Sequence, residues 1–146
     1  MTRPLRFLSP EQIIAIHDTL LGATGGRGGG HRGAAYERVD AAAQAVKNSY
    51  YETLEELAAA YAVYIVQGHV FADGNKRTGA AAMLTFLRAN GRRTAISDER
   101  LAAMMIELQR RAESGEDVVR LVRWIATELA RRPPRPRRPG RRRRRA

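Results

Sequence analysis

The sequence of 146 residues predicts an all-α protein, a compact helical bundle of about six helices. Apolar residues recur at intervals of three and four through most of residues 9–130, which is the spacing of a helix with one buried face. Residues that favour the start or the end of a helix stand at the borders of these stretches. Neither a repeat nor a strand–turn–helix phosphate motif is visible. Extended backbone is expected only in short pieces near residues 6–8 and 94–96.

The first two helices surround a glycine-rich run. We expect the first helix to follow Ser9, an N-cap residue, with Pro10 in its first turn and a capping-box glutamine two positions later. Its apolar pattern ends before Gly22. The run GGRGGG at 25–30 predicts a loop because so many glycines disfavour any regular element. A second helix is expected over about residues 32–47.

The other helices have clearer signals at their ends. The third begins at the capping box that Thr53 opens and ends at Gly68. The fourth covers residues 75–90 and stops at an Asn-Gly pair. Ser97 caps the fifth helix, and the sixth runs from about residue 117 to residue 130, where two prolines soon follow and prevent its continuation.

The formal net charge of +11 is concentrated at the end of the chain. Residues 131–146 contain ten arginines and no acidic residue, and taking ten from eleven leaves +1 for residues 1–130. We therefore divide the chain into a domain, residues 1–130, and an Arg/Pro-rich tail, which we expect to be disordered because it has no apolar anchor. The tail either attaches to nucleic acid or an acidic partner, or is a solvated end without a specific role.

Composition also limits the class of protein. The chain has no cysteine, which excludes disulfides, thiol nucleophiles and Cys-based metal sites. No apolar run approaches the roughly 18 residues of a membrane span, and the N-terminus lacks the apolar core of a signal peptide. We expect a cytoplasmic protein with no membrane partner.

Residues 69–78, HVFADGNKRT, form a dense polar segment between two apolar helices. If the fourth helix begins at the Gly-Asn pair, the unpaired N–H groups of its first turn fall on about residues 74–77. The helix dipole adds partial positive charge there, and Lys76 and Arg77 add two full charges. Cations at this end of a helix are unfavourable unless an anion binds. A phosphate chain, which Arg77 can grip bidentately, is the candidate ligand.

The other residues of this segment suggest chemistry. Asp73 would repel phosphates unless it holds Mg²⁺ together with them, although it can also serve as an N-cap. His69 can accept a proton from a hydroxyl nucleophile near neutral pH. Phe71 is expected to anchor the loop, and Gly74 allows either close backbone approach to a ligand or a tight turn. His17, on the apolar face of the first helix, either orients the site or is a packed core histidine with a backbone hydrogen bond.

At these residues the chain resembles the Fic/Doc superfamily and, within it, the Doc (death-on-curing) toxin branch. The Fic pattern is H-x-F-x-D/E-G-N-G-R, and the Doc branch has Lys where that pattern has Gly before Arg. The matching residues are His69, Phe71, Asp73, Gly74, Asn75, Lys76 and Arg77. The resemblance covers about residues 5–130, including the stretches FLSPEQIIAIHD and LTFLRANG, and it excludes the tail.

The resemblance implies a toxin of a toxin–antitoxin system, an ATP-dependent protein kinase that phosphorylates a threonine of elongation factor Tu and arrests translation. It implies that His69 is the general base and that Asp73 holds Mg²⁺ or orients the loop. Gly74 would let the backbone approach the ligand, and Asn75, Lys76 and Arg77 would bind the phosphates of ATP. A Phd-type antitoxin would inhibit the enzyme by packing a segment against the site.

Two departures from the Fic pattern bear on the reaction. Many Fic enzymes have a second Arg three residues after the motif Arg, where this chain has Ala80. Together with Lys76, that difference favours phosphate transfer over AMP transfer. No Ser or Thr is followed by Glu four positions later, so the inhibitory S/T-x-x-x-E-G/N motif of many Fic proteins is absent and inhibition is expected in trans.

Three other interpretations stay open. The first is a Fic-type nucleotidyl transferase that moves AMP to a protein hydroxyl. The second is a non-enzymatic nucleic-acid-binding protein that acts through the Arg tail, against which the almost neutral body argues. The third is a degenerate Doc-like protein that only binds a partner, against which the complete motif argues.

Overall fold

The computed structural model describes residues 4–24, 34–132 and 140, and these form six α-helices and no strand. The helices are α1 (Pro10–Thr24), α2 (Ala34–Lys47), α3 (Leu54–Gln67), α4 (Asn75–Ala89), α5 (Asp98–Glu113) and α6 (Val118–Ala130). The all-α prediction is confirmed for this part of the chain. The glycine-rich run at 25–30 and most of the Arg/Pro-rich tail lie outside the described residues, and so do the expectations for them.

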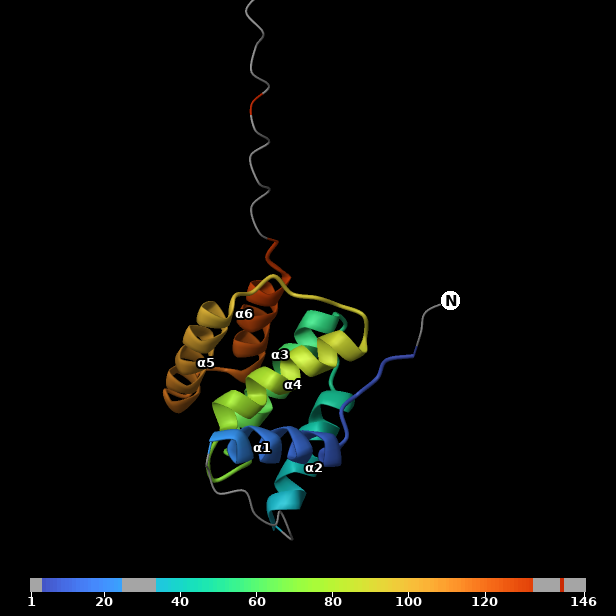
Figure 1. The fold of residues 1–146 in the computed structure, drawn as a ribbon, viewed down its shortest axis with the longest axis vertical. Helices are drawn as coiled ribbons and strands as arrows, with labels where there is room; N and C mark the ends of the chain where they lie inside the picture. Colours follow the sequence, from blue (N-terminus) through green and yellow to red (C-terminus); the bar gives the residue numbers. More distant parts are fainter. Residues whose placement is uncertain (1–3, 25–33, 133–139, 141–146) are drawn as a thin grey trace, which may run out of the picture.

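Helix α3 is the central element of the bundle. Every residue from 57 to 63 is buried, which is the pattern of a helix surrounded on all sides. In Figure 1, α3 and α4 lie in the middle, with α5 and α6 on one side and α1 and α2 on the other, and α3 contacts each of the others except α1. The core therefore surrounds α3, and the turn between α3 and α4 is attached to a firmly packed helix.

The crossing of α3 and α4 depends on a glycine just after the polar segment. A Cβ added to Gly79 would lie 3.3 Å from the Cα of Ala62 in α3 and 3.2 Å from the Cε of Met105 in α5. Both distances are tighter than ordinary van der Waals contact, so the helices approach this closely because residue 79 has no side chain. This packing fixes the first two turns of α4.

Most of the predicted helix ends are confirmed. The capping box at the start of α1 is present, with Gln12 N donating to Ser9 Oγ at 3.1 Å and Ser9 N donating to Gln12 Oε1 at 2.8 Å. Thr53 forms the same arrangement at α3, and Ser97 Oγ accepts from Arg100 N at α5. The predicted end of α1 was wrong, because the helix continues through Gly22 to Thr24. A helical Gly costs only about 1 kcal/mol relative to Ala.

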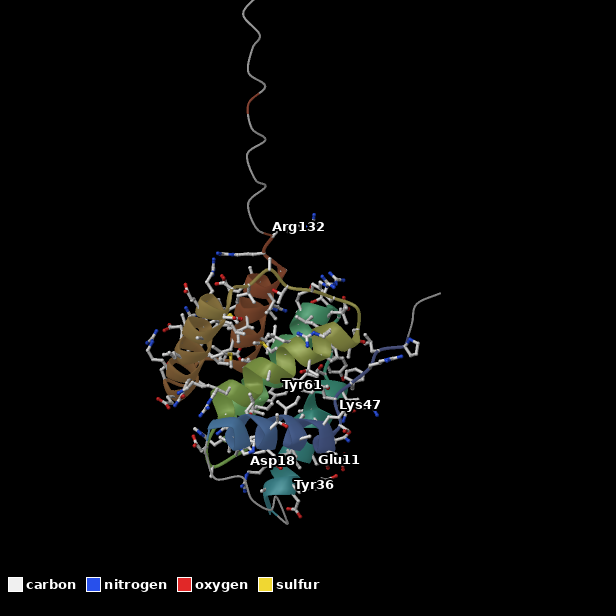
Figure 2. All side chains as sticks on the ribbon, viewed as in Figure 1. Glu11, Asp18, Tyr36, Lys47, Tyr61 and Arg132 are labelled. Atoms are coloured by element: carbon white, nitrogen blue, oxygen red, sulfur yellow. The ribbon has the colours of Figure 1, made fainter. Side chains whose placement is uncertain are left out.

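Neither the segment before α1 nor the segment near residues 94–96 forms a strand. Asn90, predicted as a helix stop, holds this first segment in place: its Oδ1 accepts from Arg6 N at 2.9 Å and its Nδ2 donates to Arg6 O at 3.0 Å. The hydroxyl of Tyr61, in the middle of the bundle (Figure 2), accepts from Leu8 N at 2.8 Å. Among the described residues, no helix has the length and apolar character to cross a bilayer.

Candidate active site

The site begins where α3 ends. Gly68 is the C-cap of α3, and its N–H donates to Tyr64 O at 3.0 Å. The next residue, His69, is exposed and has a φ of 44°, the one positive φ among the described non-glycine residues. Such a left-handed conformation costs roughly 1–3 kcal/mol, and residues of this kind concentrate at functional sites. The histidine predicted as a base is therefore held in a strained position at the mouth of the turn.

Phe71 and Asn75 fix the shape of the turn that follows. Phe71 is buried, which confirms its predicted role as the anchor of the loop. Its backbone N–H donates to Asn75 Oδ1 at 2.9 Å, and its carbonyl accepts from Asn75 Nδ2 at 2.7 Å. The side chain predicted as a phosphate ligand thus has both of its polar atoms bonded to the loop, so the structure places Asn75 as a clamp on the turn.

Gly74 is the N-cap of α4 and takes the left-handed conformation, with φ 81° and ψ 16°. Its N–H donates to Asp73 Oδ1 at 2.8 Å. Asp73 therefore does not occupy the N-cap position that the capping alternative requires, although it satisfies the N–H of the residue that does. No other hydrogen bond to its carboxylate is present within the described residues.

The first turn of α4 presents backbone donors and cations together. The first backbone bond into this helix is Thr78 N to Gly74 O at 2.9 Å. The N–H groups of Asn75, Lys76 and Arg77 have no acceptor among the residues described, and the turn contains no acid. Lys76 and Arg77 are exposed, and neither pairs with an acidic group in this part of the chain. This helix start can bind an anion through N–H groups and side chains at once.

One cleft of about 340 Å³ joins these groups. All six residues predicted for the site line it, as do three that the sequence did not indicate. The six are His69, Asp73, Gly74, Asn75, Lys76 and Arg77, and the other three are Val66, Ala72 and Gln109. Gln109 comes from α5, and its amide donates to Glu113 at 2.9 Å. No sequence signal could have found it, since a lone glutamine on a helix face is unremarkable before α5 is placed beside the motif.

The prediction of His17 as a packed histidine with a backbone hydrogen bond is confirmed. The side chain is buried, and Nε2 lies 2.8 Å from the carbonyl oxygen of Asp73. Its ring stacks on Phe71 with 3.8 Å between centroids and 7° between planes. The hydrogen bond of this core histidine therefore goes to the motif loop itself.

The residues fit Mg²⁺ only in combination with a phosphate. Within the described ranges, no group of three His, Asp or Glu side chains is arranged to hold a metal ion. Asp73 is one carboxylate beside donors that suit phosphate. Mg²⁺ commonly takes one or two protein carboxylates and fills its remaining positions with substrate phosphate and water.

Comparison with known proteins agrees with this geometry. The model of the Fic/DOC family matches residues 7–87, a range that includes α1, the polar segment and most of α4. The chain is also 38% identical over 89 residues to "Protein kinase doc" of Escherichia phage P1. That match covers 60% of this chain and 70% of the relative.

Proposed function

Because the chain belongs to the Fic/DOC family, we propose that it is a Doc-type toxin that transfers the γ-phosphate of ATP to a hydroxyl of a protein. The observation that carries this proposal is that one cleft contains a histidine, two adjacent cations and helix N–H groups that have no acceptor among the described residues. The printed name of the phage P1 relative, a protein kinase, supports phosphate as the group transferred.

The geometry suits the demands of phosphoryl transfer, which are mainly positioning and charge neutralisation. Lys76, Arg77 and the N–H groups of the first turn of α4 hold the phosphate chain. His69 takes the proton of the attacking hydroxyl while the hydroxyl oxygen bonds to the γ-phosphorus. The bond from that phosphorus to the β–γ bridging oxygen breaks, and ADP leaves. Mg²⁺, when bound beside Asp73, supplies further neutralisation of phosphate charge.

The substrate is a threonine of elongation factor Tu, and its phosphorylation arrests translation; the enzyme then acts in the cytoplasm. The test is intact-protein mass measurement of elongation factor Tu after incubation with ATP and Mg²⁺. A gain of one phosphate supports the proposal, whereas a gain of AMP reassigns the protein as a nucleotidyl transferase. Finding no gain, on a factor that a known kinase of the same family modifies in parallel, refutes this target.

The inhibitor is a Phd-type antitoxin, and an apolar groove beside the cleft supports this proposal. An apolar groove of about 440 Å³ lies between α1, α4 and α5, with walls that include Leu20, Ala80 and Ile106. The side chain of Ile106 is 62% exposed. Lys76 and Arg77 line both the groove and the cleft, so an apolar segment with acidic residues, seated in the groove, would also obstruct the phosphate site.

This partner is tested by co-expression, first with the wild-type toxin and then with a variant of the groove. The neighbouring upstream reading frame should encode a small acidic protein that protects cells from the toxin when both are expressed. Ile106→Glu should weaken that protection and leave transfer to the target unchanged, since Ile106 does not line the cleft. Full protection of the Ile106→Glu variant would remove the groove as the docking site.

A further inference from the structure

His17 is a buried imidazole in α1 that contacts the motif loop without lining the cleft. We propose that His17 is a positioning residue, which sets the place of Asp73 and of the N–H donors at the start of α4. The inference rests on the proposed function only for its effect on the reaction rate. The positioning itself is a property of the loop and can be measured without a substrate.

His17 forms a hydrogen bond to the backbone of Asp73. The carbonyl oxygen of Asp73 can only accept, so Nε2 of His17, 2.8 Å away, carries the proton. Asp18, labelled on α1 in Figure 2, lies beside the ring, with its Oδ1 3.3 Å from the other ring nitrogen. The backbone of Asp73 is therefore held from α1.

The direction of the Asp73 carboxylate is limited by a second hydrogen bond. Its Oδ1 accepts from Gly74 N at 2.8 Å. With the carbonyl held by His17 and one carboxylate oxygen held by Gly74, the side chain has little freedom left. The bond to His17 thus fixes the one acidic group of the cleft relative to the cations at the helix start.

Helix α1 also packs against the start of α4. A Cβ added to Gly74 would lie 3.6 Å from Nε2 and Cδ2 of His17 and 3.2 Å from Cδ2 of Leu21. Figure 1 shows α1 crossing beside the beginning of α4, and these two helices are in contact. The ring of His17 also stacks on Phe71. Phe71 and Asp73 therefore both contact His17, and Gly74 lies against His17 and Leu21 together. The N–H groups that follow Gly74 keep their direction because α1 holds this stretch of backbone.

The bland interpretation is that His17 merely fills space in the core. In that case the activity of a variant follows its stability, and any substitution of similar bulk is tolerated. A positioning residue behaves differently, because a donor at the position of Nε2 must be retained. A misplacement of about 1 Å can cost roughly 100-fold in rate even when the fold is intact.

The experiment compares three variants of the full chain. His17→Gln places an amide donor near Nε2, His17→Leu keeps apolar bulk without a donor, and Ile13→Ala makes a cavity at another buried position of α1. Melting temperature, kcat and KM for ATP are measured for each. We expect His17→Leu to lose about 100-fold in kcat/KM. His17→Gln should keep most of it, and Ile13→Ala should lose stability but not rate.

Equal losses for His17→Leu and His17→Gln, or a loss for His17→Leu no larger than that for Ile13→Ala, would overturn the inference. The amide ¹H–¹⁵N resonances of residues 73–77 give an independent measurement. His17→Gln should leave them near the wild-type positions, His17→Leu should move them, and Ile13→Ala should not. If the wild type transfers no phosphate, the proposed function fails while these shifts still decide the positioning role. If His17→Leu does not fold, wild-type-like shifts and rate in His17→Gln support the inference, and shifts displaced in His17→Gln but not in Ile13→Ala overturn it.

Discussion

Substitution of Asn75 by Ala separates two roles that the sequence could not distinguish. The resemblance assigns this side chain to the phosphates of ATP, whereas the structure bonds it to both polar groups of the Phe71 backbone, at 2.9 and 2.7 Å. A side chain that only binds ligand can be removed without cost to the free protein. A clamp on a half-buried turn cannot, so the free energy of unfolding of the ligand-free protein reports on the role.

The expected loss follows from the two bonds. Each typical intramolecular hydrogen bond contributes about 0.5–1.5 kcal/mol net, so the pair is worth about 2 kcal/mol. The better helix propensity of Ala at the first position of α4 returns roughly 0.5 kcal/mol. The net destabilisation is about 1.5 kcal/mol, which lowers the Tm of a domain of this size by about 3–6 °C.

The assay is urea and thermal unfolding of the ligand-free variant beside Asn48→Ala. Asn48 is exposed, and its side chain forms no hydrogen bond within the described residues, so it controls for the loss of an asparagine. Asn75→Asp adds a graded step, since it keeps an acceptor for Phe71 N–H and loses the donor to Phe71 O. If Asn75→Ala unfolds at the same temperature as Asn48→Ala, the clamp is not energetically significant and the argument fails.

Four further predictions follow from the site, the core and the tail. His69→Gly should abolish transfer without lowering Tm, because Gly accepts the φ of 44° that strains the histidine; a Tm loss in unfolding scans would contradict this. Lys76→Gly should lower phosphate transfer and raise AMP transfer to the same target, as read by intact mass, and an unchanged product would show that Lys76 does not select the reaction. Burial raises the pKa of Tyr61 and of Tyr51 to about 12 from 10.0, so the stability they contribute is full below about pH 10 and is lost as pH rises through about 12. Tyr61→Phe should therefore flatten the fall in unfolding free energy between about pH 10 and 12. Deletion of residues 131–146 should remove salt-sensitive binding to nucleic acid and leave transfer intact, which filter binding across a salt series can measure.

Local sequence signals predicted the helices well because each depends on neighbours in the chain. The capping boxes at Ser9 and Thr53 are bonded within three residues, so spacing alone reveals them. Gly22 misled the prediction since a glycine ends a helix only when the backbone leaves the helical region there, and nothing in the surrounding residues shows that. Position 22 stays helical.

The composition of the site could also be predicted, but the division of labour within it could not. His69, Asp73 and Lys76 line the cleft as the motif suggests. The clamp role of Asn75 depends on the turn bringing its amide back to Phe71. The contact of His17 with Asp73 spans 56 positions and exists only because α1 crosses the start of α4. Such contacts depend on helix packing, which the order of residues along one element does not determine.

The segment 69–78 gathers several features that are each unfavourable to folding. A histidine is held at a positive φ, two cations stand at the positive end of a helix dipole, and the hydroxyl of Thr78 is buried without a partner in the described part of the chain. It would be unusual for three such unfavourable features to gather by chance in a protein whose core otherwise packs closely around α3. The close contact of Gly79 with Ala62 holds the helix start from the other side, so the surrounding bundle can tolerate them. A bound phosphate chain would relieve the cationic cost directly, because it places negative charge where donors and cations already converge. The protein is therefore expected to gain stability on binding nucleotide. We interpret these locally unfavourable features as a sign that the segment is a binding site.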